Sequence, residues 1–228
     1  MQKPRDRNYQ LATLKGNILQ SINRIRSVKA IFHSIYFNHR WGDGESVSGT
    51  GSKIDQTRTI STCLPEIFRR YNIQHLLDIP CGDFNWMSSV DLSSVQYSGA
   101  DIVGPLIKKN MTHHGCPRVS FFVADIIAGN LPRADLILCR DCFVHFADKH
   151  VFKAVGNIKR SGAEYLLTTT FPLHENFDIV TGSWRPINLQ AEPFCFAPPL
   201  ELINEGYHKE GSGIADKSLA LWRIPELP

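Results

Sequence analysis

The chain has 228 residues and a mass of 25.7 kDa, with 43% hydrophobic and 21% charged residues and no run of about eighteen apolar ones. These values exclude a collagen-like, coiled-coil, fully disordered or membrane-spanning chain and predict one sizeable domain. Residues 1–40 hold eight Lys/Arg and one Asp (+7), and residues 41–228 hold seventeen Lys/Arg and twenty-one Asp/Glu (−4), so the globular part has no obvious nucleic-acid surface.

Two features indicate a reducing, cytoplasmic location. The first ten residues are charged, and they lack the apolar stretch and small-residue cleavage site of a secretory signal. The six cysteines occur in a long chain that does not look secreted, so we expect free thiols rather than disulfides.

The N-terminal part is predicted to contain a basic helix and a glycine-rich loop. Residues 1–16 are polar and basic and predict a loose tail, whereas from Ile18 to Tyr36 the apolar residues recur at helical spacing. Residues 41–53, WGDGESVSGTGSK, concentrate small turn formers and predict an unusual loop. A second helix is predicted at 55–70, where Pro65 is expected to introduce a kink.

The rest of the chain alternates short apolar strands with helical stretches. The predicted strands are 75–79, 97–103, 120–124, 135–139 and 165–169, followed by a last strand at 217–224. The predicted helical stretches are 84–90, 104–111 and 148–160. Alternation of this kind favours parallel pairing with right-handed crossovers, hence an α/β, Rossmann-like doubly wound sheet with helices on both faces. Such sheets bind ligands at the carboxyl ends of their strands.

The first predicted strand ends in a turn with a single glycine, Gly82. A dinucleotide fingerprint needs three glycines, and Pro80 and Phe84 would crowd a phosphate, so the turn argues against NAD or FAD. A nucleoside without phosphates needs only one close approach of the backbone, which Gly82 supplies. The alternative is that Gly82 is an ordinary turn glycine.

The second predicted strand carries an acid near its end, and an acid directly follows the third. Asp101 follows Gly82 by nineteen residues, the place where a carboxylate binds a ribose diol in such folds, although Asp101 could also cap a helix. Asp125 can accept a hydrogen bond from an exocyclic amino group, while the next backbone amide, that of Ile126, faces a purine ring nitrogen. The ordered occurrence of all three features favours a nucleoside site.

The segments LLDIPCGDFNWM, YSGADIV, FFVADII and LPRADLILCRDCFVHF resemble successive motifs of the class I S-adenosylmethionine-dependent methyltransferases, over roughly residues 73–170. The resemblance implies about seven strands with an antiparallel last strand, and S-adenosyl-L-methionine as cofactor. It also implies cofactor-binding roles, with the methionine side lined by Asp78, Cys81, Gly82 and Asp83, the ribose at Asp101, the adenine at Asp125 and Ile126, and further contacts from Ile102 and Cys139. The turn after the first predicted strand departs from the family's usual glycine-rich pattern at Pro80 and Phe84.

Further segments resemble a smaller subgroup of these enzymes that is associated with glycan and polysaccharide modification. They are WGDGESVSGTGS, TTTFPLHENFD and WRPINLQAEPF. The end of the fourth strand faces the methyl group in the family, and there the Asn/Asp-Pro-Pro-aromatic motif of adenine- and glutamine-methylating enzymes is absent.

Three ionisable residues stand at this predicted reaction centre instead, and we predict catalytic roles for them. His145 is the first candidate for a general base because its ordinary pKa lies near neutral pH. Asp141 is expected to orient His145 or to act itself, and Arg140 to hold the substrate or to pair with Asp141. His145 could also be a structural histidine, and Asp141 could hold a metal, although no metal-binding spacing occurs and none is predicted. Cys139 ends a strand, which argues against a redox pair with Cys142.

The polar segment after the fifth strand is predicted to form the acceptor wall, unless it is an ordinary surface loop. An aromatic face beside directional hydrogen-bonding groups is typical of sugar sites, and the predicted acceptor-binding residues are His174, Asn176, Trp184, Arg185 and Asn188. The favoured function is therefore O-methylation of a saccharide hydroxyl. A small-molecule or natural-product methyltransferase and a non-catalytic S-adenosylmethionine-binding protein are the alternatives.

Residues 1–53 are predicted to form a separate unit from the methyltransferase domain at 54–228. In the favoured interpretation the helix packs on the domain or on a second subunit, giving a homodimer, and the loop closes over the cofactor with Ser46, Thr50 and Gly51 facing it. In the alternative, the basic helix lies on an anionic membrane surface.

Overall fold

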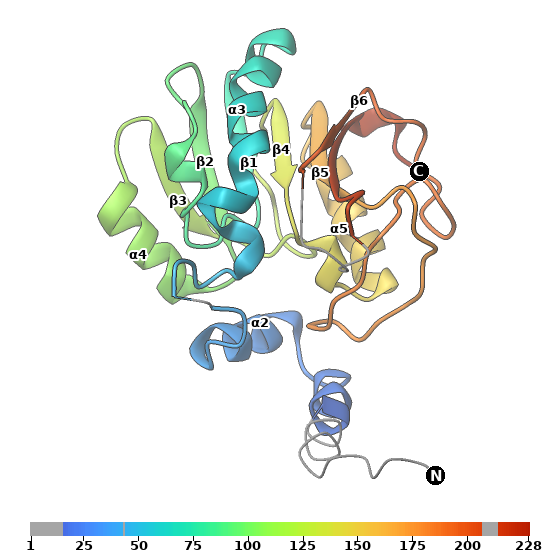
Figure 1. The fold of residues 1–228 in the computed structure, drawn as a ribbon. Helices are drawn as coiled ribbons and strands as arrows, with labels where there is room; N and C mark the ends of the chain where they lie inside the picture. Colours follow the sequence, from blue (N-terminus) through green and yellow to red (C-terminus); the bar gives the residue numbers. More distant parts are fainter. Residues whose placement is uncertain (1–15, 43, 207–213) are drawn as a thin grey trace.

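The computed structural model describes residues 16–42, 44–206 and 214–228, and most of the predicted N-terminal tail lies outside them. One seven-stranded sheet runs through the molecule in the order β3-β2-β1-β4-β5-β7-β6 (Figure 1). Strands β1 to β5 pair in parallel, and β7 pairs antiparallel with both β5 and β6. The predicted α/β, mostly parallel sheet of about seven strands with an antiparallel last strand is confirmed. The strands are β1 (His75–Asp78), β2 (Gln96–Asp101), β3 (Val119–Val123), β4 (Leu136–Cys139), β5 (Tyr165–Thr170), β6 (Glu201–Asn204) and β7 (Ser218–Arg223).

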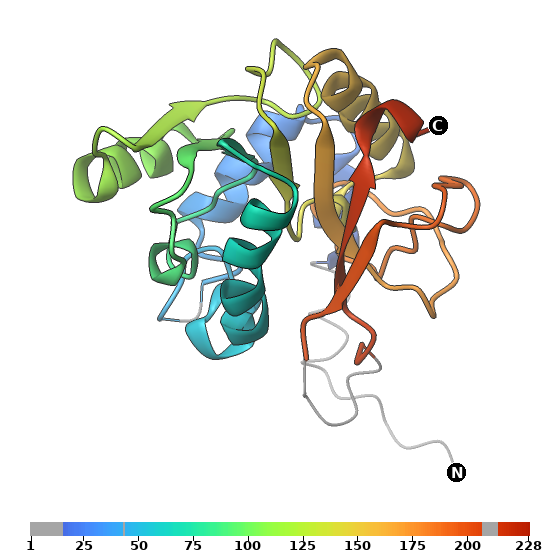
Figure 2. The same cartoon turned by 90° about the horizontal axis from the view of Figure 1, so that it is seen from above.

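Helices cover both faces of the sheet, with α3 and α5 on opposite sides (Figure 2). Apolar residues of α3 pack with those of α4 on one face, and α5 packs with Val28 of α2 on the other. The central strand β4 is buried along its whole length, because a parallel strand covered on both faces needs a continuous apolar run. The helices are α2 (Val28–Phe37), α3 (Ile54–Arg70), α4 (Gly104–His114) and α5 (Asp148–Arg160).

The predicted continuous helix from Ile18 to Tyr36 is wrong. Residues 16–23 are helical, a turn follows, and α2 begins afresh after Ser27, whose hydroxyl accepts from the amide of Ala30 at 3.2 Å. A serine N-cap satisfies an orphan amide at a helix start, so the break has a local cause that apolar spacing does not show.

Three further elements differ from the sequence predictions. The stretch 84–90 contains only a 3₁₀ turn at Met87–Ser89, because Phe84 takes a positive φ of 61° that a helix cannot include. Helix α3 is one continuous element despite Pro65. Strand β6 was not predicted, since its alternating burial leaves only a weak apolar signal.

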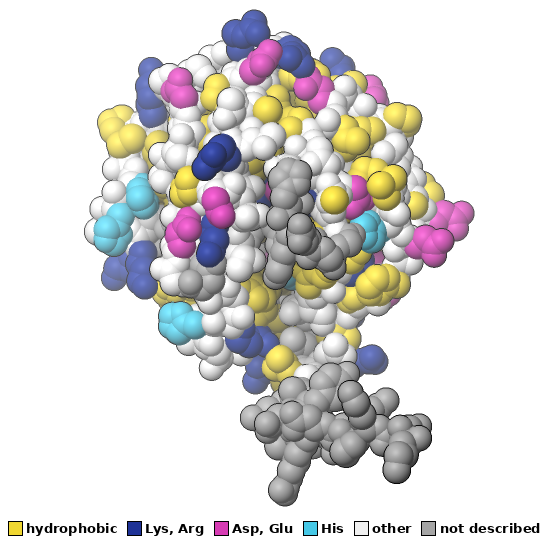
Figure 3. All heavy atoms as spheres, viewed as in Figure 1, with side chains coloured by type: hydrophobic (Ala, Val, Ile, Leu, Met, Phe, Trp, Pro, Cys, Tyr) yellow, Lys and Arg dark blue, Asp and Glu magenta, His cyan; other side chains and the backbone are white. Residues whose placement is uncertain are grey.

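The charged side chains are mixed on the surface. Figure 3 shows acidic and basic side chains intermingled on one face of the molecule. No helix within the described ranges is long and apolar enough to cross a membrane. All six cysteines are free thiols.

Candidate functional site

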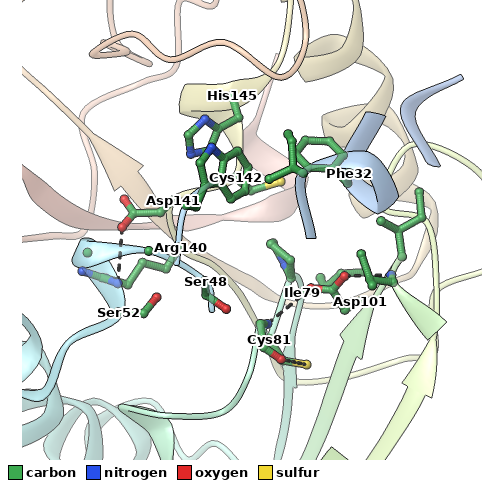
Figure 4. Close-up of a pocket in the computed structure, with 18 of the residues that line it drawn as sticks. Phe32, Ser48, Ser52, Ile79, Cys81, Asp101, Arg140, Asp141, Cys142 and His145 are labelled. Carbon is green, nitrogen blue, oxygen red and sulfur yellow. Dashed lines mark hydrogen bonds and ion pairs between the residues drawn. The ribbon is translucent and has the colours of Figure 1, made fainter. Parts of the chain in front are cut away.

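A cavity of about 500 Å³ lies at the carboxyl ends of the parallel strands, the edge at which doubly wound sheets bind ligands. Its floor comes from the turns after β1, β2, β3 and β4, and its roof from α2 and the loop of residues 47–52. In Figure 4, Asp101 lies on one side of the cavity and His145 and Asp141 on the other, with Ser48 between them and Ser52 beside Arg140. The sheet topology therefore brings the predicted strand-end residues to one place.

The turn after β1 is tied to the glycine-rich loop. Gly82 has a φ of 55°, and a Cβ atom there would collide with the hydroxyl of Ser48. The next carboxylate, that of Asp83, accepts from the Ser46 hydroxyl and from the amide of Val47, each at 2.8 Å. Ser46 and Asp83 lie outside the cavity lining, and their contacts hold the loop down on the turn.

Asp101 lies in the cavity wall after β2. Its carboxylate accepts from the amide of Val103 at 2.9 Å and from the amide of Gly82 at 3.3 Å. Helix α4 is capped at Val103 without a side-chain bond, so Asp101 is not its N-cap residue. Burial raises the pKa of Asp101 to about 6, which the backbone hydrogen bonds oppose. The neighbouring Ile102 also lines the cavity.

Asp78, at the end of β1, is the most deeply buried acid of the cavity. It is 2% exposed and accepts from the hydroxyl of Tyr97 at 2.6 Å. Burial raises the pKa of Asp78 to about 7, although the Tyr97 hydrogen bond opposes the shift. A carboxylate in this environment gains from a cationic ligand, because the cation favours the ionised form.

The remaining predicted cofactor-binding residues divide into two groups. Those that line the cavity are Cys81, Gly82, Asp125, Ile126, Thr50 and Gly51. Cys139 is fully buried in the core and does not line it. Burial also raises the pKa of Asp125, which is half-buried and accepts from the amide of Ile127 at 3.0 Å.

Arg140 and Asp141 belong to a cluster of four charges, which we call the β4–β7 charge cluster: Arg140, Asp141, Glu205 and Lys217. Arg140 donates two hydrogen bonds to Glu205, at 3.1 and 2.6 Å, and Lys217 donates to Asp141 at 2.7 Å. Burial alone would raise the pKa of Asp141, but Arg140 and Lys217 outweigh it and hold the pKa well below its usual range. Asp141 is therefore a poor proton acceptor.

His145 has the geometry of a neutral base. Its Nδ1 lies 2.7 Å from the carbonyl oxygen of Ser183, which can only accept, so Nδ1 carries the proton and Nε2 keeps its lone pair. Trp41 stacks on the imidazole at 4.3 Å between ring centroids. Burial lowers the pKa of His145, which keeps the ring neutral at physiological pH.

Of the predicted acceptor-binding residues, the structure places only Trp184 in the cavity lining, 46% exposed. Arg185 has no exposed surface and donates to the carbonyl of Phe146 and to Asp148, both at 2.7 Å. The other three brace the loop: Asn176 and Asn188 bond to each other and to neighbouring carbonyls, and His174 bonds to Asp216.

Sequence reasoning missed several residues of the cavity and its surroundings. Phe32 of α2 and Trp41 of the loop after α2 pack edge to face at 5.8 Å, and Phe32 also contacts Phe146. Glu205 and Lys217 come from the chain after β6 and before β7. No local motif marks these residues, because only the sheet order brings β7 beside β5.

Comparison with known proteins identifies the fold. No protein-family model matches the sequence, and no curated protein matches it either. The structure is similar to N-methyltransferase NodS from Bradyrhizobium japonicum WM9, with a TM-score of 0.54, 16% identity, and coverage of 74% of this chain and 96% of that one. It is also similar to human N-acetylserotonin methyltransferase in complex with SAM, with a TM-score of 0.51, 13% identity, and coverage of 83% and 61%.

LaPhzM gives a further match, with a TM-score of 0.50, 13% identity, and coverage of 73% of this chain and 55% of that one. The chain therefore has the Rossmann-like fold of the class I S-adenosylmethionine-dependent methyltransferases. NodS is an N-methyltransferase and the human enzyme is an N-acetylserotonin methyltransferase, so the shared fold leaves the acceptor open.

The position of Asp101 leads to a first prediction. Replacing it with alanine should weaken binding of S-adenosylhomocysteine roughly 10- to 100-fold, the loss expected for one or two hydrogen bonds to a charged acceptor. Calorimetric titration measures the change. Asp91→Ala is the matched control, because Asp91 is exposed on a turn away from the cavity. Unchanged affinity in the Asp101 variant would contradict the ribose assignment.

Proposed function

We propose that the protein is an S-adenosylmethionine-dependent methyltransferase that methylates a hydroxyl group of a saccharide. The observation that carries the proposal is the neutral imidazole of His145 in the same cavity as the strand-end acids. The fold of the structural neighbours and the resemblance of the strand-end motifs support the cofactor.

The residues of the cavity fit this cofactor. Asp101 would accept from the ribose hydroxyls, and Asp125 with the amide of Ile126 would meet the adenine. The buried carboxylate of Asp78 suits a cationic amino-acid end, because burial has raised its pKa and a positive charge would favour its ionised form. Burial raises the pKa values of three cavity acids, Asp78, Asp101 and Asp125, and a sulfonium nucleoside offers the positive charges and hydrogen-bond donors that favour their ionised forms. When bound, such a cofactor supplies an activated methyl group.

The protein must then align the acceptor and remove its proton. A sugar hydroxyl is a weak acid, so it gains from a base within hydrogen-bond reach, whereas a neutral amine attacks without prior deprotonation. Nε2 of His145 takes the proton, and the negative charge of Asp141 favours the resulting imidazolium while the positive charge of Lys217 opposes it. The roof formed by α2 and residues 47–52 excludes water from the reacting groups.

One exposed aromatic face supports a saccharide acceptor. Trp184 is half-exposed at the cavity wall and packs edge-on against Phe171 at 6.0 Å, so one face of its indole remains available for stacking. The resemblance of three further segments to a glycan-modifying subgroup points the same way. A small-molecule hydroxyl compound is the second candidate acceptor. We assign Arg185, Asn176 and Asn188 to the architecture of this loop rather than to the acceptor.

The decisive experiment incubates the protein with methyl-labelled S-adenosylmethionine and panels of saccharide and non-saccharide hydroxyl compounds. Transfer to saccharides supports the proposal, and transfer only to amines or to non-saccharide hydroxyls contradicts it. Binding of the cofactor without transfer to any acceptor would favour a non-catalytic binding protein.

The raised pKa of Asp78 predicts a pH dependence of cofactor binding. The ammonium group of S-adenosylhomocysteine attracts only the ionised carboxylate, and Asp78 ionises as the pH rises through about 7. Affinity should therefore rise by up to about tenfold per pH unit below 7 and level off above 8, with release of protons. Calorimetry between pH 5.5 and 8.5 in buffers of different ionisation enthalpy measures both quantities.

Two controls separate Asp78 from the other cavity acids. 5′-Methylthioadenosine lacks the amino-acid end, so its binding should lack the step near pH 7 that belongs to Asp78 and keep the contributions of Asp101 and Asp125. Asp78→Asn should remove the step near pH 7 for S-adenosylhomocysteine. A step of unchanged size in this variant would show that another group titrates.

A further inference from the structure

Arg40 is a charged residue of the cavity wall that the proposed chemistry does not use. It follows the end of α2, and its Nε and Nη2 atoms are buried without a hydrogen-bond partner in the described part of the chain. Buried guanidinium groups are normally hydrogen-bonded, because loss of hydration without a partner is costly. Burial, followed by the positive charge of Arg26, lowers the pKa of Arg40, but a guanidinium stays protonated at neutral pH.

The other cations of the cavity differ from Arg40 in having anionic partners. Arg140 forms an ion pair with Glu205, and Lys217 forms ion pairs with Asp141 and Glu205. The two positive and two negative charges of the β4–β7 charge cluster therefore balance. No described carboxylate forms an ion pair with Arg40. A ligand that fills the cavity therefore meets an uncompensated positive charge with unsatisfied donors.

The surrounding contacts place the backbone of Arg40 beside the His145 side of the cavity. The amide of Arg40 donates to the carbonyl of Ile35 at 3.1 Å. The side chain of Ile35 in turn lies next to Gly182, because its Cδ1 atom is 3.7 Å from the position that a Cβ atom would take at Gly182. Gly182 donates its amide to the carbonyl of His145 at 2.9 Å. The next residue after Arg40 is Trp41, which stacks on the His145 ring. Asp101 lies on the opposite side (Figure 4).

We propose that Arg40 binds an anionic group of the acceptor, so that the substrate is an acidic saccharide carrying a carboxylate or a phosphate. The planar fork of the guanidinium matches either group with two parallel hydrogen bonds. This inference rests on the proposed function and narrows its substrate class. The competing anion is the carboxylate of the cofactor itself, which the experiment must separate.

In the test, three probes are titrated into the complex that the protein forms with S-adenosylhomocysteine. They are D-glucuronate, D-glucose 1-phosphate and the neutral methyl D-glucoside. The unaltered protein should bind an anionic probe more tightly than the neutral one, and the tighter of the two anions identifies the group. Arg40→Met should lower the affinity for that anion roughly 10- to 100-fold, while the affinities for the neutral sugar and for S-adenosylhomocysteine stay unchanged.

Arg58→Met removes the same charge from the exposed side of α3 and is the matched control, expected to change no affinity. The proposal is overturned if the unaltered protein shows no preference for either anion. It is also overturned if Arg40→Met lowers the affinity for S-adenosylhomocysteine but not the affinity for 5′-methylthioadenosine, because the guanidinium then binds the carboxylate of the cofactor. Failure of the unaltered protein to bind S-adenosylhomocysteine would be a different result, since it removes the proposed function and this inference with it.

Discussion

Replacing His145 with alanine should lower turnover about 10²- to 10⁴-fold, the usual contribution of a general base, with little change in cofactor affinity. The reason is the tautomer that the Ser183 carbonyl imposes, which leaves Nε2 as a free proton acceptor in the cavity. Asp141 does not offer the same combination, because the charge cluster keeps it ionised and already bonded. Single-turnover rates with labelled cofactor measure the loss.

The pH profile separates a catalytic from a structural role of His145. Since the pKa of the ring is lowered, turnover of the unaltered protein should be flat at neutral pH and should fall only as acid protonates Nε2. The residual turnover of His145→Ala should be low and should no longer fall with this acid-side pH dependence. His113→Ala is the control, because His113 is exposed on α4 and bonds only the Lys109 carbonyl. Near-normal turnover of His145→Ala across pH 6–9 would remove the base assignment.

Arg140→Met should destabilise the fold by about 3–5 kcal/mol, the loss typical of breaking one side of a buried ion pair. The guanidinium is almost completely buried, its two bonds to Glu205 are lost, and Glu205 retains only the 3.2 Å contact with Lys217. In a domain of this size the melting temperature should fall by roughly 6–20 °C. Thermal unfolding followed by circular dichroism measures the fall.

Two matched variants test the cause. Arg70→Met removes an exposed arginine that also contacts a glutamate, Glu201, and should leave the melting temperature nearly unchanged. Arg140→Met combined with Glu205→Leu removes both charges and should recover much of the loss. If the double variant is no more stable than Arg140→Met, the unpaired carboxylate of Glu205 is not what destabilises the fold.

The order of strands and helices could be predicted from the sequence because each central strand is a short, continuous apolar run. Strands β4 and β5 are buried along their whole lengths, so their signal is strong. Strand β6 lies at the sheet edge with alternate residues exposed, and this pattern is too short to stand out. The break before α2 depends on one serine hydroxyl, which a search for apolar periodicity passes over.

In the site, too, the residues near strand ends could be predicted from the sequence, whereas contacts between distant parts of the chain could not. Asp78 and Asp101 lie near the ends of predicted strands and Asp125 directly follows one, so their meeting at one edge follows from the topology. The hydrogen-bond partner of Arg140, Glu205, lies 65 residues further along the chain, and no local pattern shows that it will face Arg140. Arg185 and Asn188 have side chains suited to sugars, but the same groups also satisfy buried carbonyls, and only their burial separates the two uses.

The loop after β5 holds His145 through main-chain atoms alone: the carbonyl of Ser183 and the amide of Gly182. The side chains at 183 and 184 are therefore free to change without altering the tautomer of the imidazole. Substrate preference in this scaffold can diversify at Trp184 while the proton-transfer chemistry stays the same. Gly182 is the exception, since a Cβ there would strike Ile31 of α2 and disturb the contact between roof and loop. A laboratory search for new acceptors should accordingly randomise the two positions after the glycine and leave the glycine itself untouched.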